Sequence, residues 1–168
     1  MDNKKLSRIF IAVIVLMALN GLVEQMGVIK LTIARINGYG LNATMETYDG
    51  DATLTVLTEE GARLEVRLIG VTIPYEYIAK DYFNTIVKTD MEIYLLFERD
   101  AYDINAKVPT YVYLQPKDVG HIKRSLNGLL IKDGIAEVFI RDPYNEHIEV
   151  FESLMIESQN NGLGMWEK

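Results

Sequence analysis

The sequence predicts an α+β fold, a small five-stranded β-barrel with helices packed on it, preceded by an N-terminal transmembrane helix. Three observations predict it. Five segments have strand-like sequences, and those at 52–57 and 64–68 alternate apolar and polar residues, as half-buried strands do. Segments with helical spacing follow the third and the fifth of them. An uninterrupted apolar run stands behind basic residues near the N-terminus.

The apolar run, residues 9–23, follows Lys4, Lys5 and Arg8. Counted from Leu6, a helix here reaches roughly 25 Å, just short of the ~30 Å hydrocarbon core of a bilayer. Positive flanks stay on the cytoplasmic side, or on the matrix side of an organelle. We therefore expect a single-pass membrane protein, held through residues 6–23, with its globular domain on the opposite side.

A cleaved signal peptide has the same charged start and apolar middle. Its cleavage site requires small residues, and the sequence Ala18-Leu19-Asn20 is a poor match. We favour an uncleaved anchor; cleavage would make the protein secreted. The expected organisation is an anchor or signal segment at 1–27, a connector at 28–43 and a globular domain at 44–168.

The expected strands begin with a hairpin, because Asp49-Gly50 stands between two strand-like runs. Apolar and polar residues alternate in the third run, and two further runs follow the first helix. The five ranges are Met45–Tyr48, Ala52–Leu57, Leu64–Leu68, Met91–Phe97 and Thr110–Leu114.

Three helices are expected. The first spans Tyr77–Lys88, and the second spans Ser125–Lys132 and is closed by Asp133-Gly134. Asp142-Pro143 is typical of a helix start, with aspartate as N-cap and proline in the first turn. The last helix should therefore begin there and end near Gly162.

The composition excludes some kinds of site. With no cysteine there is no disulfide, thiolate nucleophile or cysteine-bound zinc. The net charge is -7, and from residue 9 onward 14 basic residues face 23 acidic ones, a net charge of -9. Nucleic acid would be repelled unless basic residues cluster, so it is not an expected partner.

Several motifs, in order, resemble the staphylococcal nuclease (thermonuclease) family. They are Asp49-Gly50-Asp51, Val66-Arg67-Leu68-Ile69-Gly70-Val71, Pro74, a helix motif over residues 125–136 and the ending Gly162-Leu163-Gly164-Met165-Trp166. The resemblance covers Thr44 to Trp166 and implies an OB-type five-stranded barrel with three helices.

The resemblance also implies a chemistry. Family nucleases hold calcium with carboxylates, use a glutamate to assist the attacking water and neutralise the scissile phosphate with two arginines. That division of labour suits a hard cation and a reaction that builds negative charge. Asp51 falls on a metal ligand and Arg67 on the first arginine.

The remaining positions depart from the family. The second metal aspartate falls at Thr72, the backbone-ligand threonine at Ile73, the glutamate at Tyr75 and the second arginine at Lys107. One carboxylate is too few for a tight calcium site, and lysine cannot make the bidentate fork of arginine. Glu76, one residue beyond Tyr75, could reach back and substitute for the family glutamate. We therefore expect no cofactor and no catalytic residues.

Plainer interpretations of Asp51 and Arg67 stay open. Aspartate favours hairpin turns, so Asp51 could serve the turn alone. Arg67 could pair with Glu65 or Glu92 instead of a phosphate.

Two functions follow. The first is a membrane-anchored, catalytically inactive domain that acts as a structural or interaction module, or as an accessory subunit of a membrane assembly, with protein partners. The alternative is a calcium-dependent nuclease, secreted or anchored, with a rearranged site of Asp51, Arg67, Glu76 and Lys107.

Overall fold

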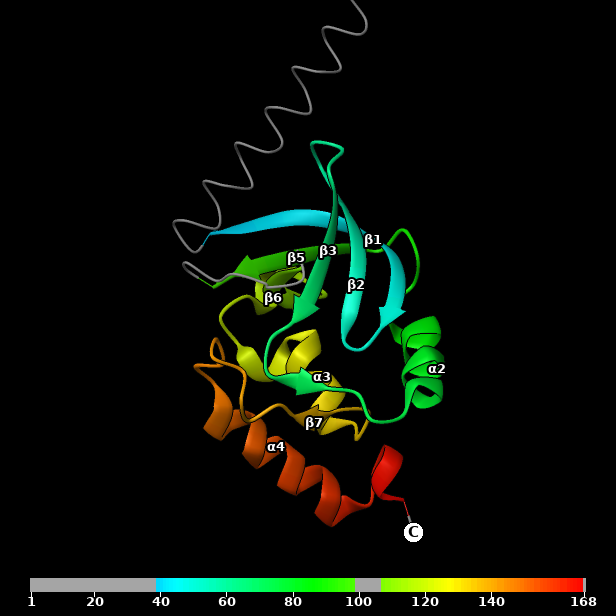
Figure 1. The fold of residues 1–168 in the computed structure, drawn as a ribbon, viewed down its shortest axis with the longest axis vertical. Helices are drawn as coiled ribbons and strands as arrows, with labels where there is room; N and C mark the ends of the chain where they lie inside the picture. Colours follow the sequence, from blue (N-terminus) through cyan, green and yellow to red (C-terminus); the bar gives the residue numbers. More distant parts are fainter. Residues whose placement is uncertain (1–38, 99–106, 168) are drawn as a thin grey trace, which may run out of the picture.

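The computed structural model describes residues 39–98 and 107–167 (Figure 1). Five strands form a closed barrel in the order β1-β2-β3-β6-β5, and β4 pairs with β7 in a separate small sheet. The strands are β1 (Gly40–Gly50), β2 (Thr53–Thr58), β3 (Arg63–Leu68), β4 (Val71–Thr72), β5 (Glu92–Phe97), β6 (Val108–Tyr113) and β7 (Glu137–Val138).

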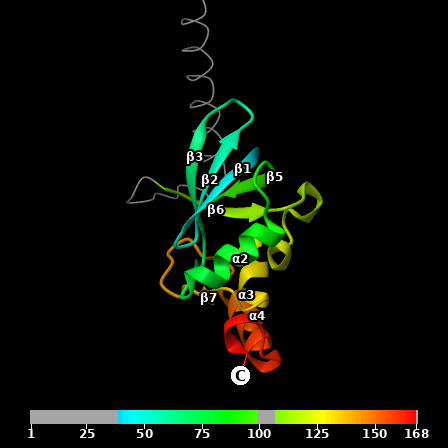
Figure 2. The same ribbon diagram turned by 90° about the vertical axis from the view of Figure 1, so that its right-hand side faces the viewer.

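Three α-helices belong to the described part of the chain: α2 (Glu76–Ile86), α3 (Leu126–Lys132) and α4 (Ile148–Asn161). Figure 1 shows α3, β7 and α4 stacked below the barrel, and Figure 2 shows α2 lying across its side. The prediction of a five-stranded barrel, with helices after the third and fifth barrel strands, is confirmed.

The barrel interior follows the alternation in the sequence. Leu54 and Val56 of β2, and Val66 and Leu68 of β3, are all 0% exposed. Adjacent strands pair antiparallel except β3 and β6, which run parallel, with Val66 opposite Val108. Residues between the buried ones, including Arg67, therefore lie on the outside of the barrel.

Asn127 fastens α3 to the barrel. Its side-chain amide donates to the carbonyls of Ile69 (2.9 Å) and Thr110 (3.2 Å), and its oxygen accepts from the N–H of Val112 (3.0 Å). The helix itself starts at Ser125, whose hydroxyl accepts from the N–H of Gly128. The end of β3 and the middle of β6 are thus held in fixed positions.

Two boundaries differ from the sequence prediction. The first strand begins at Gly40, ahead of the expected domain start at residue 44. The prediction that Asp142 caps the last helix is wrong, because α4 begins at Ile148 with His147 at the N-cap position. Asp142 has another partner, described below.

The expected membrane helix lies in residues 1–38, outside the described part. Within residues 39–98 and 107–167, no helix combines the length and the apolar character that crossing a bilayer requires.

Candidate functional site

The β1–β2 turn carries Asp51. Gly50 pairs with Thr53, so the two turn residues are Asp51 and Ala52, two residues beyond the predicted Asp49-Gly50. Their φ angles are 48° and 55°, in the left-handed region that non-glycine residues seldom adopt. Both central positions of a type I′ hairpin turn need positive φ.

Glu76, the first residue of α2, holds this turn in place. One carboxylate oxygen, Oε1, accepts the backbone N–H of Asp51 at 2.7 Å. The other, Oε2, accepts the hydroxyl of Tyr48 at 2.7 Å. Bonds to an ionised acceptor are among the strong hydrogen bonds of proteins, so the carboxylate compensates for the strained backbone of the turn.

Tyr48 links the turn to the helix. Its ring stacks on Phe83 of α2 with ring centres 4.1 Å apart and planes 7° from parallel. Burial, and then the hydrogen bond to Glu76, raise the pKa of the Tyr48 hydroxyl well above its usual value. The hydroxyl therefore stays protonated and keeps donating to Glu76.

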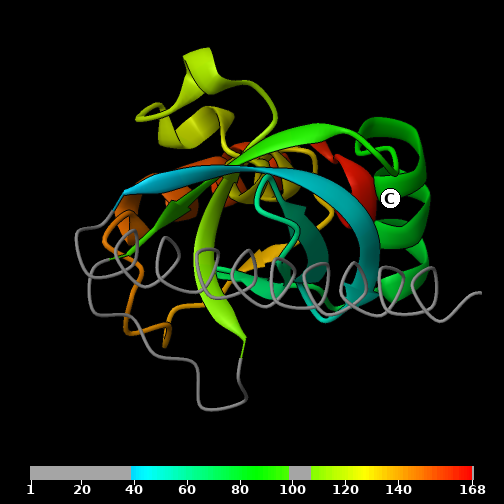
Figure 3. The same ribbon diagram turned by 90° about the horizontal axis from the view of Figure 1, so that it is seen from above.

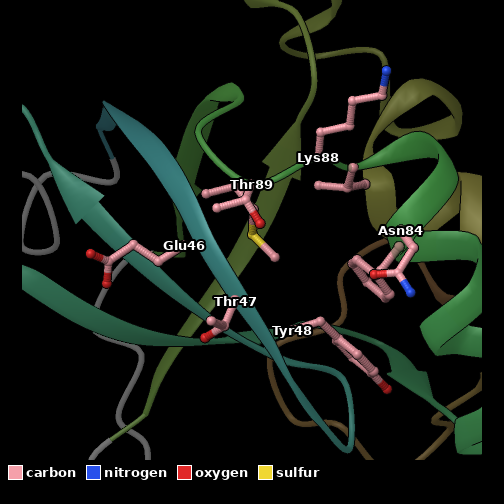
Figure 4. A pocket seen from close by; sticks show the side chains of 9 residues that line it. Glu46, Thr47, Tyr48, Asn84, Lys88 and Thr89 are labelled. Atoms are coloured by element: carbon pink, nitrogen blue, oxygen red, sulfur yellow. The ribbon is translucent and has the colours of Figure 1, made fainter.

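A hollow of about 160 Å³ opens beside this stack, between β1 and the C-terminal end of α2 (Figure 4). In Figure 4, Tyr48 and Asn84 lie on the α2 side of β1, whereas Glu46 extends from the opposite side and the Lys88 side chain extends away. Glu46 is bound by the guanidinium of Arg63, with Nε 2.6 Å from Oε2, which lowers the pKa of the Glu46 carboxyl.

Arg67 forms an ion pair with Asp142, with Nη1 2.7 Å from Oδ2. The exposed fraction of the side chain is 0% for Asp142 and 22% for Arg67. The same Oδ2 accepts the N–H of Gly70 at 2.8 Å, and Oδ1 accepts the N–H of Tyr144 at 3.1 Å. A buried carboxylate needs such partners, and here they come from the segment that contains Arg67 and Gly70 and from nearby Tyr144.

Gly70 brings the chain close enough for that contact. Its φ is +75°, and a Cβ added here would lie 2.5 Å from Nδ2 of Asn145 and 2.9 Å from the ring of Phe151. Only glycine accepts both the left-handed backbone and the close approach. Glycine at position 70 therefore allows its own N–H to donate to Asp142.

Lys107 contacts β2 next to Arg67. Thr53 pairs with Arg67 across β2 and β3. The lysine Nζ donates to the Thr53 hydroxyl at 2.9 Å. Thr53 Oγ1 also donates to the Asp51 carbonyl, so Asp51, Thr53, Arg67 and Lys107 lie near one end of the barrel.

Three further positions considered in the sequence analysis, Thr72, Ile73 and Tyr75, precede the first residue of α2. Thr72 pairs with Glu137 in the small sheet, and Ile73 is buried. Tyr75 is 49% exposed and stands at the N-cap of α2, with its ring 6.2 Å from that of Tyr77.

A family model described as staphylococcal nuclease homologue matches residues 54–168. The chain belongs to the staphylococcal nuclease family. A search of curated proteins finds no matching relative. The match begins at β2 and includes Arg67, Glu76, Lys107 and Asp142, while Asp51 lies just ahead of it.

Because nucleases of this family bind calcium through carboxylates, we looked for a group of such ligands. No group of three or more acidic or histidine side chains within residues 39–98 and 107–167 could hold a metal ion. Near the turn, Asp49 accepts the hydroxyls of Thr47 and Thr55, both at 2.6 Å. The metal role of Asp51 and the catalytic roles considered for Arg67, Glu76 and Lys107 stay predictions.

The contacts of two residues in this region were missed by the sequence analysis. Asp142 looked like a helix cap, because Asp-Pro is a strong local signal. Tyr48 was expected only as the last residue of the first strand. No local signal revealed the role of Asp142, because the pairing of β4 with β7 that brings this segment to Gly70 involves only two residues of each strand.

Proposed function

We propose that this chain is a membrane-anchored staphylococcal-nuclease-like domain without nuclease activity, and that it acts as an interaction module or an accessory subunit of a membrane assembly. The observation that carries the proposal is the ion pair between Arg67 and the fully buried Asp142. Because its guanidinium already neutralises a buried carboxylate, Arg67 has less positive charge to offer a phosphate, and moving it away would remove the charged partner of Asp142.

The carboxylate of Glu76, beside the β1–β2 turn, supports the same proposal. Both oxygens of Glu76 are already hydrogen-bonded, to the Tyr48 hydroxyl and to the Asp51 N–H. Lone pairs remain on each oxygen, but binding a cation there would compete with bonds that hold a strained turn. Tyr75, at the position of the family glutamate, carries no carboxylate.

The proposed anchor is the apolar run at residues 9–23 behind Lys4, Lys5 and Arg8. The mass of the chain isolated from membranes tests it. An uncleaved anchor predicts a mass that includes residues 1–27, and extraction that needs detergent; a shortened, freely soluble chain would replace the anchor by a signal peptide.

The catalytic part of the proposal is tested by incubating the full-length chain with single-stranded DNA and RNA, with calcium or with a chelator. We expect no calcium-dependent cleavage. Cleavage that needs calcium and is lost in Asp51→Ala would contradict the proposal.

One observation favours the second candidate, a nuclease with a rearranged site. Glu76 Oε1 lies 2.7 Å from the N–H of Asp51, so these two acidic residues are neighbours at the end of the barrel that also holds Lys107. That candidate predicts nuclease activity that is lower in both Glu76→Gln and Lys107→Ala than in the unaltered chain. The first candidate predicts no nuclease activity in any of the three.

A further inference from the structure

A second surface lies at the other end of β1 from Asp51. Leu41 and Ala43 point into the barrel, so Asn42 and Thr44 lie on its outer face. Thr44 pairs with Glu92 of β5. Figure 3 shows the segment containing the short helix η1 (Pro116–Asp118) projecting from the barrel beside these strands.

Between the strands and that segment lies a hollow of about 270 Å³, larger than the one beside Tyr48. Half-buried Leu114 supplies an apolar wall, and Glu59 and Glu92 supply carboxylates. Glu59 accepts the side-chain amide of Asn42 at 3.0 Å. The hollow is lined by Asn42, Ala43, Thr44, Glu59, Glu92, Ile93, Leu114, Gln115 and Pro116, with no lysine or arginine among them.

Of the two carboxylates, that of Glu92 differs from the other acidic groups discussed above. Glu46, Asp49, Glu76 and Asp142 are each held by hydrogen bonds or ion pairs within the fold. Glu92 is exposed, and within residues 39–98 and 107–167 its carboxylate has no hydrogen bond or ion pair. An acidic rim around a partly apolar hollow suits a lysine or arginine side chain, whose methylene stem packs on apolar atoms while its charged end reaches a carboxylate.

The charge of the whole body points the same way. Residues 39–98 and 107–167 contain 10 basic and 20 acidic residues, a net charge of -10. Such a field raises the association rate of a cationic partner and repels phosphate backbones and anionic membranes. We propose that this hollow, which we call the Glu59–Glu92 hollow, is a docking site for a lysine- or arginine-rich segment of a partner protein.

This inference rests on the proposed role as an interaction module and names the chemistry of its partner. It can be tested with the full-length chain in detergent micelles and a fluorescein-labelled peptide of alternating lysine and serine, followed by fluorescence anisotropy. The double variant Glu59→Gln, Glu92→Gln removes the two carboxylates. The matched control, Glu149→Gln with Glu157→Gln, removes the same charge from exposed positions on α4.

We expect the first pair of substitutions to weaken peptide binding about tenfold and the control pair less than about twofold, since only contacting charges dominate affinity. Equal losses in the two pairs, or no binding to the unaltered chain, would overturn the inference. Spermidine that binds as tightly as the peptide, with the same dependence on Glu92, would overturn the choice of a protein partner.

A second measurement uses the absence of native cysteine. Thr44→Cys, alkylated with a bulky maleimide, fills the hollow without changing its charge, and Glu149→Cys treated in the same way is the control. We expect binding to be lost only in the first. Calcium-dependent cleavage in the nuclease assay would contradict the proposed function alone, whereas absent peptide binding in a chain without nuclease activity would contradict this inference alone.

Discussion

Arg67 and Asp142 lie 75 residues apart in the chain and form an ion pair with Nη1 2.7 Å from Oδ2, in which the Asp142 side chain is fully buried. Asp142 joins the barrel strand β3, the backbone of Gly70 and the segment before α4. The pair therefore connects the barrel to the helical layer beneath it. We expect its loss to affect the stability of the fold rather than a reaction.

Replacing Asp142 by alanine should lower the free energy of unfolding by about 3 kcal/mol, because an arginine and the Gly70 N–H lose a buried partner. Urea denaturation of the full-length chain in detergent, followed by fluorescence of the single tryptophan, measures it. The control is Asp118→Ala, which breaks an exposed pair with Arg124 and should cost less than about 1 kcal/mol. Similar costs for the two variants would contradict the structural role of Asp142.

Gly70→Ala should be more damaging than Gly61→Ala. Both glycines have positive φ, 75° and 80°, so both substitutions carry a backbone cost of about 1 kcal/mol. A Cβ at Gly70 also meets Asn145 and Phe151, whereas nothing lies within 4 Å of a Cβ at Gly61. We expect the two midpoints of thermal unfolding to separate clearly, with Gly70→Ala lower. Coinciding midpoints would show that the segment around Asn145 yields freely.

Glu76→Ala should lower the free energy of unfolding by about 2 kcal/mol, because the Tyr48 hydroxyl and the Asp51 N–H both lose their acceptor. Exposed Glu65, on β3, provides a control whose replacement by alanine should change stability by less than about 0.5 kcal/mol. Amide hydrogen exchange offers a local readout, since Asp51 should lose protection only in the first variant. Unchanged protection there would contradict the role assigned to Glu76.

Tyr48→Phe should produce a pH-dependent loss. The pKa of the Tyr48 hydroxyl is raised above its unfolded value of 10.0, mainly by burial and next by the bond to Glu76. A raised pKa contributes stability that is fully present below pH 10 and declines as the pH rises toward the higher folded value. The stability gap between the unaltered chain and Tyr48→Phe, measured by urea unfolding at pH 8 and pH 11, should shrink at pH 11. A constant gap would mean that Tyr48 titrates normally.

Much of the fold was predictable because its signals are local. Alternation placed the barrel strands, Asp133-Gly134 and Gly162 marked helix ends, and Ser125 marked a helix start. The two-residue strands β4 and β7 are too short to show a period. The hairpin turn lies two residues later than predicted, because β1, with its register shifts, extends through Gly50.

The site was harder, because its partners are distant in sequence. Arg67 invited pairing with nearby Glu65 or Glu92, whereas the ion pair found is with Asp142, which the local Asp-Pro pattern had assigned to a helix cap. A helix-cap preference is worth about 1 kcal/mol. Leaving the buried carboxylate of Asp142 without its charged partner costs more than that, so the distant contact prevails.

The central claim is that Arg67 serves the fold and does not bind phosphate. The most direct measurement follows the guanidinium resonances of Arg67 by NMR in the full-length chain in micelles, while calcium and a short single-stranded DNA are added. We predict that they stay unchanged during the titration and shift in Asp142→Asn. Resonances that respond to DNA only when calcium is present, and that are insensitive to Asp142→Asn, would contradict the account.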